Sequence, residues 1–396
     1  MCGIAGIIGE GAAQPETLAR MLAALAHRGP DGAGQLHLAR ARVGLTASRL
    51  ALLDDDGGAQ PWREADLALV FNGELYNHPA LAEALTRAGC RPPRTRCDTE
   101  TLARGWRALG SGLWGQLDGM FAAAIVDGDE LILARDPHGQ KPLFLWRSPQ
   151  GDALLFASEI ATLVADPRVP RALDPQVLVE LGALGFPLGD DALLAGLRSL
   201  PAGHELRVRV GADGRLQSRL WDYRLGSASP RCVGAVELPH PLAGLAPRRD
   251  TPRRDTPHQD PRAAVDALVA RLPGIVADHA RADHPVGIFL SGGLDSGLLA
   301  ALLAEQAEGE VHSFTLADDP AHPDLLAARA LAEAIGTHHH ERIVDVDELV
   351  AAWPLTVAAQ GLPTMPTLAE LGGAWARRWV KAALVGDGAD ELFAGY

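Results

Sequence analysis

The second residue of the chain, Cys2, has the functional groups of an N-terminal nucleophile. It follows the initiator methionine, and a small residue in second place permits removal of Met1, which would leave a thiol and an α-amine together on Cys2. The pKa of a free α-amine is about 7.7–8.0, so part of it is neutral near pH 7 and can accept the thiol proton. An activated thiol attacks a carboxamide readily. The alternative is a chance cysteine whose thiol is buried in a strand.

A second candidate site is the turn Ser291-Gly292-Gly293-Leu294-Asp295-Ser296. It follows a predicted strand, Val286–Leu290, and opens a predicted helix over Leu294–Glu305. Such a turn presents backbone N–H groups and a helix N-terminus to an anion. The residues Gly-Lys-Ser/Thr do not follow it, so the turn is not a Walker A loop. We predict a phosphate site of a different type.

The histidines and cysteines do not form a metal-binding pattern. The run His338-His339-His340-Glu341 makes a poor chelate on a strand, because adjacent side chains there point to opposite faces. The cysteine spacing fits neither a zinc site nor a dense disulfide framework, which favours a reducing, cytoplasmic location. The four cysteines are Cys2, Cys90, Cys97 and Cys232.

We expect a layered α+β domain to position Cys2. Short apolar runs bounded by Gly, Asp or Pro predict strands, and the helical spacing of Leu18–Leu25 and Leu81–Leu85 predicts interposed helices. Strands with interposed helices pack in layers around a core. The predicted strands are Gly3–Ile8, Leu67–Phe71, Ala122–Val126, Leu131–Leu133, Leu143–Trp146 and Leu154–Phe156.

A separate α/β domain over residues 263–396 is expected to position the turn at Ser291. Its strands and helices alternate, which is typical of a parallel sheet with helices on both faces. Pro273 is expected to end or kink the first helix. Residues 226–262 repeat Arg-Arg-Asp-Thr-Pro without an apolar period, so we predict an extended linker there. The other predicted elements are strands at Val311–Thr315, Arg342–Val344 and Ala382–Val385 and a helix over Leu325–Ile335.

The composition excludes several classes of function. Hydrophobic residues make up 47% of the chain and charged residues 22%, which is typical of a globular protein with a sizeable core. A formal net charge of −14 does not favour nonspecific nucleic-acid binding. No apolar run reaches about 18 residues and the N-terminus lacks a basic segment, so we expect neither a membrane span nor a secretory signal.

A series of motifs resembles the class II glutamine amidotransferase domain. The resemblance covers residues 2–210 and implies an N-terminal-nucleophile hydrolase with a four-layer αββα fold, which releases ammonia from glutamine. The motifs are Met1-Cys2-Gly3-Ile4, His27-Arg28-Gly29-Pro30-Asp31, Ser48-Arg49-Leu50-Ala51-Leu52-Leu53-Asp54, Phe71-Asn72-Gly73-Glu74-Leu75-Tyr76-Asn77-His78, Cys97-Asp98-Thr99-Glu100, Gly119-Met120-Phe121 and Ala134-Arg135-Asp136 through Lys141-Pro142-Leu143.

This resemblance assigns roles around Cys2. The Asn72 side-chain amide and the Gly73 backbone N–H would hold the oxyanion of a tetrahedral intermediate. Arg49 would pair with the α-carboxylate of glutamine and Asp98 with its α-ammonium group, and Arg28 would order a loop over the site. Asn-Gly is also a strong hairpin-turn signal, so a turn at residues 72–73 is an alternative that does not exclude this role. The implied catalytic and glutamine-binding residues are Cys2, Arg49, Leu50, Ala51, Leu52, Leu53, Asn72, Gly73, Glu74 and Asp98.

The turn at Ser291 resembles the PP-loop of ATP pyrophosphatases, and residues 385–396 resemble the segment that closes on the nucleotide. The resemblance implies ATP and Mg²⁺ as ligands, with the ion chelated through oxygen atoms of Asp295 and Asp390. Asp387 would support formation of an acyl-adenylate. Helix N-capping is the alternative for these acidic residues. The implied ATP-binding residues are Leu290, Ser291, Gly292, Gly293, Leu294, Asp295, Ser296, Leu316, Val385 and Gly386.

A glutaminase followed by a PP-loop domain is similar to the asparagine synthetase (glutamine-hydrolysing) family. The resemblance implies an ATP-dependent carbon–nitrogen ligase, in which ammonia from glutamine passes through an internal channel to an adenylated aspartate β-carboxylate. Val385 stands where this family usually has Ser, and its members continue beyond the position of Tyr396. We therefore expect intact glutaminase chemistry and an incomplete, truncated PP-loop domain, and the resemblance is compatible with a homodimer or a complementing partner chain.

Several alternatives remain open. The acceptor is either aspartate or a different carboxylate, and the chain is either bifunctional, a glutaminase-only fragment or subunit that needs a partner chain, or a non-catalytic scaffold. Two related classes fit less well. Cyclising enzymes that make β-lactams lack the N-terminal cysteine, and phosphoribosyl or sugar-phosphate amidotransferases lack the turn at Ser291.

Overall fold

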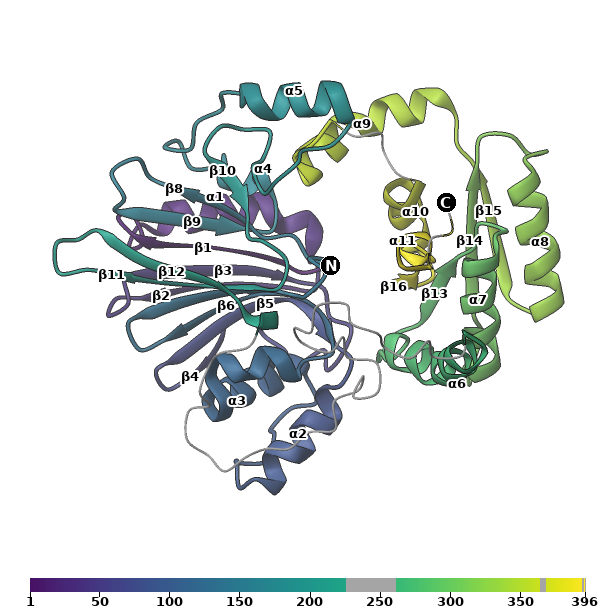
Figure 1. Cartoon of the computed structure of the whole chain (residues 1–396), viewed down its shortest axis with the longest axis horizontal. Coiled ribbons are helices and arrows are strands. Elements are labelled where there is room, and N and C mark those ends of the chain that lie inside the picture. Colours follow the sequence, from purple (N-terminus) through teal and green to yellow (C-terminus); the bar gives the residue numbers. More distant parts are fainter. Residues whose placement is uncertain (226–260, 364–367, 394, 396) are drawn as a thin grey trace. The chain divides into compact units, whose positions relative to one another are not determined.

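The chain divides into two compact units in its computed structural model (Figure 1). Unit 1 comprises Met1–Ala246 with Val357–Leu362, and unit 2 comprises Pro247–Thr356 with Pro363–Tyr396. The structure describes residues 1–225, 261–363, 368–393 and 395. The predicted linker over 226–262 therefore lies outside the described residues, except for its last two positions, which begin a helix.

Unit 1 contains two six-stranded antiparallel sheets that pack face to face. Ile4 and Val43 of one sheet share a core with Val70 and Ala124 of the other. The first sheet has the order β10 (Leu197–Ser199), β8 (Phe144–Arg147), β9 (Ala153–Ala157), β1 (Gly3–Gly9), β3 (Val43–Arg49) and β2 (Gly32–Leu38). The second has the order β12 (Leu216–Asp222), β11 (His204–Val210), β7 (Glu130–Arg135), β6 (Gly119–Asp127), β5 (Leu67–Leu75) and β4 (Trp62–Glu64).

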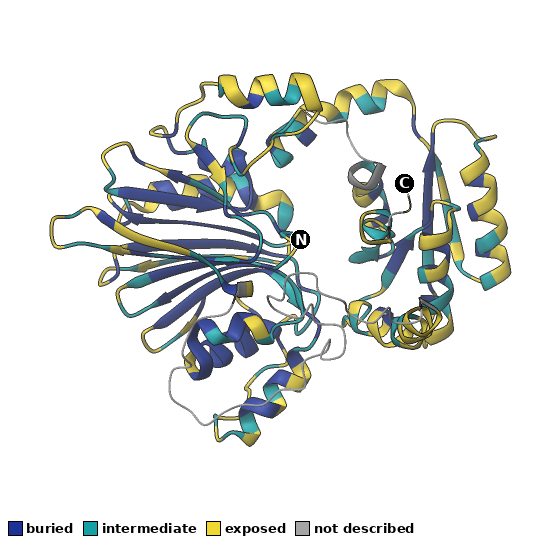
Figure 2. Cartoon of the chain, in the orientation of Figure 1, coloured by how far each residue is buried: buried dark blue, intermediate teal, exposed yellow. Residues whose placement is uncertain are grey.

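Helices cover the outer face of each sheet in unit 1. The apolar residues Leu18 and Met21 recur with helical spacing and pack on the first sheet, whereas Leu102 and Trp106 pack on the second. Figure 2 shows the strands of both sheets largely buried. This arrangement confirms the predicted αββα sandwich. The covering helices are α1 (Pro15–Leu25) and α4 (Ile160–Leu163) on the first sheet, and α2 (His78–Arg87) and α3 (Asp98–Leu109) on the second, while α5 spans Pro175–Leu184.

Unit 2 is a parallel α/β domain, as predicted. Its four-stranded sheet has the order β15 (His338–Ile343), β14 (His312–Ala317), β13 (Val286–Phe289) and β16 (Ala382–Leu384). Val276, Ala300 and Ala328 bring three helices onto one face, and Phe314 packs with Ala376 on the other. The helices are α6 (Pro261–His279), α7 (Leu294–Gln306), α8 (Pro323–Ile335), α10 (Leu368–Ala376), α11 (Ala389–Phe393) and α9 (Val346–Gln360), of which the part up to Thr356 belongs to unit 2.

Several elements differ from the sequence expectations. Pro273 lies inside α6, which continues to His279 because Val276, beyond the proline, packs into the core of unit 2. Strand β12 pairs with β11, so the second sheet extends to Asp222, past the boundary expected at residue 210. None of the described helices has both the length and the apolar character that crossing a bilayer requires.

Candidate functional site

The Cys2 thiol lies at the end of the first sheet. The pairing of β1 with β3 places Gly3 opposite Ser48, so Cys2 lies beside the residues that follow β3. The Leu50 N–H donates to Cys2 Sγ at 3.4 Å, and the thiol faces the Leu50 carbonyl oxygen at 3.6 Å. The sheet register therefore fixes the position of the predicted nucleophile.

A buried ion pair holds the backbone of Cys2. Arg28 Nε donates to the Cys2 carbonyl oxygen at 2.9 Å, and Arg28 Nη1 donates to Glu159 Oε1 at 2.7 Å. The exposed fractions of the two side chains are 9% and 3%. The neighbouring Ser158 Oγ accepts the N–H of Ile4 at 3.0 Å. Sequence reasoning missed Glu159; its only local signal is an acidic residue just beyond a predicted strand.

The predicted oxyanion donors lie within a strand and not in a hairpin turn. In β5, Asn72 pairs with Ala122 and Gly73 with Phe121 of β6, so the turn alternative is wrong. Asn72 is 1% exposed, and its Nδ2 has no hydrogen-bond partner among the described residues. Leaving such a donor unpaired costs about 1–3 kcal/mol. A Cβ at Gly73 would lie 2.3 Å from the Met120 carbonyl oxygen, so this position requires glycine.

The expected glutamine-binding residues occupy a loop and a helix start. Leu50–Leu53 follow β3, and Arg49 Nη1 and Nη2 donate to the carbonyl oxygens of Leu53, Asp54 and Asp55 at 2.6–2.9 Å. Arg49 therefore shapes this loop. Asp98 begins α3, accepts the Leu75 N–H at 3.2 Å and is buried.

Burial changes the ionisation of several groups at this site. It raises the pKa of the Asp98 carboxyl to about 6 and raises the pKa of the Cys2 thiol. Although Met1 as a whole is 55% exposed, its amino group is enclosed, and this lowers the amine pKa to about 6. The thiol is also within electrostatic range of Asp98 and Arg49, which places these three groups in one cluster.

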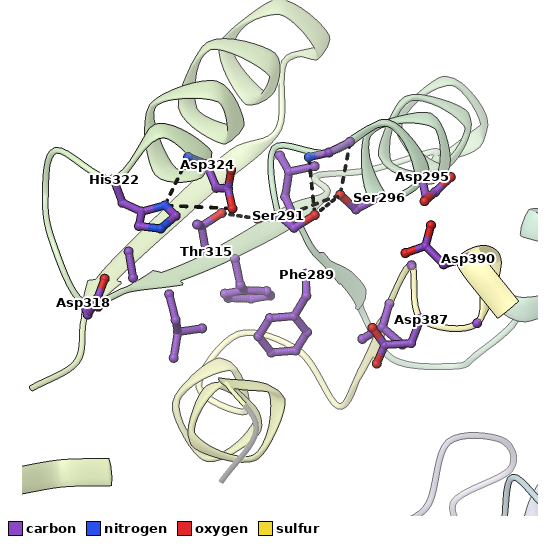
Figure 3. A pocket seen from close by; sticks show the side chains of 18 of the residues that line it. Phe289, Ser291, Asp295, Ser296, Thr315, Asp318, His322, Asp324, Asp387 and Asp390 are labelled. Atoms are coloured by element: carbon purple, nitrogen blue, oxygen red, sulfur yellow. Dashed lines mark hydrogen bonds and ion pairs between the residues drawn. The ribbon is translucent and has the colours of Figure 1, made fainter. Parts of the chain in front are cut away.

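A cavity of about 920 Å³ lies at the carboxyl ends of β13 and β14 in unit 2 (Figure 3). Two predicted ATP-binding residues, Gly292 and Leu294, do not line this cavity. Leu294 is 85% exposed, and Gly292 lies in the turn with a backbone φ of +75°. The predicted residues that do line it are Leu290, Ser291, Gly293, Asp295, Ser296, Leu316, Val385, Gly386, Asp387 and Asp390.

The turn before α7 is shaped for an anion. Ser291 N donates to Ser296 Oγ at 3.1 Å, and the two hydroxyl oxygens are 2.8 Å apart. A Cβ at Gly292 would lie 2.5 Å from the Asp324 carbonyl oxygen, so only glycine fits this approach. The N-cap residue of α7 is Gly293, which has no side chain to bond the first N–H groups of the helix, so they can bind a phosphate.

Acidic residues surround this cavity. Figure 3 shows the carboxylates of Asp295 and Asp390 on the same side of it. The described residues contain no group of three or more His, Cys, Asp or Glu side chains that could hold a metal ion. Two carboxylates nevertheless fit Mg²⁺ that arrives with a nucleotide, because phosphate oxygens and water complete its octahedron.

Further cavity-lining residues escaped sequence reasoning. These residues follow β14 in the chain, in the same way that Ser291 follows β13. The two strands are parallel neighbours, so the residues that follow them lie at the same edge of the sheet. Applying that rule to β14 would have found them. They are Asp318, His322 and Asp324. Phe289, which also lines the cavity, is the last residue of β13.

The histidine run lies on β15 and packs within unit 2. His339 Nδ1 is 2.9 Å from Ser313 Oγ, and His340 Nε2 is 3.1 Å from His312 Nδ1. The His340 ring packs on Trp379, with ring centroids 4.1 Å apart. The run therefore stabilises the contact between β14, β15 and the segment that follows α10.

Comparison with known proteins now gives the family. A glutamine amidotransferase domain matches residues 1–221, which is more than half of the chain, and an asparagine synthase domain matches residues 267–396. The chain belongs to the asparagine synthetase (glutamine-hydrolysing) family. Its N-terminal unit is an N-terminal-nucleophile type amidotransferase fold with antiparallel sheets, and its C-terminal unit is a parallel α/β domain that resembles PP-loop synthetases.

Two curated sequence relatives agree with this assignment. A protein of Mycobacterium tuberculosis assigned as a glutamine-hydrolysing asparagine synthetase is 33% identical over 419 residues, which cover 100% of this chain and 60% of the relative. Asparagine synthetase 1 of Bacillus subtilis is 27% identical, with 100% and 59% covered. The solved structure of glutamine phosphoribosylpyrophosphate amidotransferase from B. subtilis is similar with a TM-score of 0.40 at 19% identity, covering 86% of this chain and 65% of that one. This chain thus spans about 60% of the length of these curated relatives.

Proposed function

We propose that unit 1 hydrolyses glutamine at Cys2 and that unit 2 uses ATP to activate the carboxylate that receives the ammonia, with the β-carboxylate of aspartate as the acceptor. The observation that carries this proposal is the unpaired, buried Asn72 amide donor at a site that also holds a fixed Cys2 thiol. A buried donor without a partner is explained if a ligand oxygen accepts its proton.

The glutaminase half-reaction begins after removal of Met1. The Cys2 α-amine accepts the thiol proton, and the sulfur attacks the side-chain carbonyl carbon of glutamine. The negative charge that forms on the carbonyl oxygen accepts hydrogen bonds from Asn72 Nδ2 and the Gly73 N–H. The C–N bond then breaks, the amine returns the proton to the departing nitrogen, and ammonia leaves a thioester on Cys2. Water hydrolyses this thioester to glutamate and restores the thiol.

Two residues, Asp98 and Arg49, would hold the rest of the glutamine. The ionised Asp98 carboxylate pairs with the α-ammonium group, which explains why this carboxyl group is buried at the start of α3 without a cationic partner among the described residues. Arg49 acts by shaping the Leu50–Leu53 loop through three carbonyl contacts. A direct contact from Arg49 to the α-carboxylate would exchange one of these bonds to a neutral carbonyl oxygen for an ion pair.

The synthetase half-reaction would take place at the cavity of unit 2. An acceptor carboxylate oxygen attacks the α-phosphorus of ATP, and pyrophosphate leaves onto the turn Ser291–Ser296 and the N-terminus of α7. Ammonia then attacks the acyl carbon of the adenylate and releases AMP. Asp295 and Asp390 would hold Mg²⁺ on the phosphates, where the ion would neutralise their charge.

The proposal is tested by incubating the pure chain with glutamine and, separately, with glutamine, Mg·ATP and aspartate. We expect glutamate in both reactions, and asparagine with equal AMP and pyrophosphate in the second. Absence of glutamate from a chain whose Met1 has been removed contradicts the glutaminase assignment. Glutamate without asparagine, but with AMP formed in the presence of another carboxylate, would replace aspartate by that acceptor.

A further inference from the structure

Lys141 is a buried cation beside Cys2 whose contacts the proposed reaction leaves unexplained. Its side chain comes from the segment between β7 and β8 and is 6% exposed. Nζ contacts the Met1 Sδ at 3.0 Å, and it forms an ion pair with none of the described carboxylates. Burying an unpaired ammonium group is costly. The one polar contact that Nζ makes with the described residues is moreover to Met1, which the reaction requires to be removed.

The protein backbone holds this lysine in place. Asp136 is fully buried and accepts the N–H groups of His138, Gln140 and Lys141, each at 3.0 Å, together with the Phe121 N–H at 3.2 Å. Arg135 Nε also donates to the Lys141 carbonyl oxygen at 2.8 Å. These bonds tie the segment to β6, the neighbour of the strand that carries Asn72 and Gly73. Lys141 is therefore aimed at this site by fixed structure.

The groups around Lys141 are those of the nucleophile. Burial, reinforced by the nearby Arg28 charge, lowers the Lys141 pKa to about 8, although Asp136, Cys2 and Glu74 act in the opposite direction. The terminal amine is in turn within electrostatic range of Cys2, Arg28, Lys141 and Asp31. The lysine, the thiol and the amine thus influence one another's charge.

We propose that Lys141 is a positioning residue for glutamine hydrolysis, whose ammonium group lies beside the α-amine of mature Cys2 and favours the free-base form of that amine. Removal of Met1 takes away the sulfur contact and leaves Nζ facing the new amine. A like charge within about 4–6 Å disfavours protonation, and the amine must be unprotonated to accept the thiol proton. This inference rests on the proposed function of Cys2.

The pH profile separates this role from a merely structural one. K141M removes the positive charge, so the amine is protonated more easily. In the pH profile of kcat/KM for glutamate release, the pKa of the acid limb should therefore rise by about one unit. Near pH 6.5 the variant should be about tenfold slower than the wild type, and near pH 9 the two should agree within about threefold. K141R keeps the charge and should keep the acid limb.

A second readout does not depend on turnover. The chain has only two lysines, Lys141 and Lys381, so protein labelled with ¹³Cε-lysine gives two signals, and K381M identifies the one from Lys141. We expect Lys141 to titrate at least one pH unit below the ordinary lysine pKa of about 10.4, and its titration to differ between chains with and without Met1. K381M should leave the pH profile of glutamate release unchanged.

The inference is overturned if both lysines titrate together near their ordinary pKa of about 10.4. It is also overturned if folded K141M, or K141Q where K141M does not fold, loses kcat/KM by the same factor at every pH. These results are distinct from a failure of the proposed function. If the processed wild type releases no glutamate, the proposal that Cys2 hydrolyses glutamine is refuted. The lysine titration still shows in that case whether the Lys141 ammonium group is perturbed by its surroundings.

Discussion

The proposed glutaminase site in unit 1 is buried and held by strands, whereas the proposed nucleotide site in unit 2 is open and formed by turns. Asn72 and Asp98 are almost inaccessible. Ser291, Asp295 and Asp387, in contrast, are exposed around a cavity of about 920 Å³. Both proposed sites use backbone N–H groups. These groups are shielded from water in unit 1 and accessible in unit 2.

The difference follows from what each site has to do. Cleavage of an amide requires donors that are fixed before the charge develops and are shielded from water, and paired strands provide such positions. Binding a triphosphate requires several N–H groups that a large anion can reach, and a glycine-containing turn before a helix provides these. Substitutions in unit 1 should therefore change rates, and substitutions in unit 2 should mainly change binding.

The largest expected effect is on the nucleophile. C2A should lower glutamate release by roughly 10⁴-fold or more, because Cys2 is the one cysteine of the described residues that lies at the end of β1. ATP-dependent reactions supplied with free ammonia should be unchanged if the two sites are chemically separate. Glutamate release is the measurement, and C90A is the control, because Cys90 packs against the helical core of unit 1. Equal losses in C2A and C90A would contradict the assignment.

The next effect tests the buried donor. N72A removes one oxyanion donor and should lower kcat by about 10²–10³-fold while KM for glutamine changes little. N72D should be at least as slow, because a carboxylate repels the developing charge. Steady-state kinetics decide the point. A rise in KM with unchanged kcat would mean that Asn72 binds the substrate and does not stabilise the transition state.

In unit 2, G292A should impair nucleotide binding without affecting glutamate release. The position has a φ of +75°, and the added Cβ would lie 2.5 Å from the Asp324 carbonyl oxygen. The strain of about 1–3 kcal/mol corresponds to a loss of about 10–100-fold in affinity for Mg·ATP, measured by calorimetry. G373A, where a Cβ meets nothing within 4 Å, should bind ATP normally. A parallel loss of glutamate release in G292A would show that the two sites are not separate.

The smallest expected effect is a stability gain in D98N. The Asp98 pKa is raised from 3.8 to about 6 by burial, so the wild-type chain loses stability as pH rises through this window and the variant does not. At pH 7 we expect the free energy of unfolding of D98N to be about 1 kcal/mol higher than that of the wild type. The raised pKa corresponds to a cost of about 3 kcal/mol, but the hydrogen bonds that the substitution removes offset part of this gain.

Denaturant unfolding between pH 5 and pH 7.5 gives the result, and the gain should shrink as the pH falls. D222N is the control of opposite sign, because Arg224 lowers the Asp222 pKa and removal of that carboxylate should not stabilise the chain. A D98N variant that is less stable than the wild type at every pH would show that ionisation of the buried Asp98 carboxyl does not destabilise the chain.

The parts of the fold that could be predicted from sequence are those with a continuous apolar signal. Gly3–Ile8 and Val286–Leu290 are flanked by clear turns, and both were located within one or two residues. β3 was missed because Val43–Arg49 is buried along its whole length yet mixes small, polar and apolar residues without alternation.

The candidate sites show the same division. Motif residues that lie next to one another in the chain, such as Asn72 and Gly73, could be assigned, although their place inside β5 could not. Glu159 could not be found, because its partner Arg28 is 131 positions away and only the sheet order brings the two together. Lys141 was visible as part of a motif, but its direction depends on the hydrogen bonds that Asp136 makes with the surrounding backbone.

The most direct test of the account is to trap the covalent intermediate. The processed chain, mixed with excess glutamine, quenched in acid within milliseconds and digested, should carry one glutamyl group per chain, on the sulfur of the peptide that begins with Cys2. Mass spectrometry should show this adduct in the wild type and not in C2A. Glutamate release by a chain that retains Met1, or without any adduct on Cys2, would contradict the account.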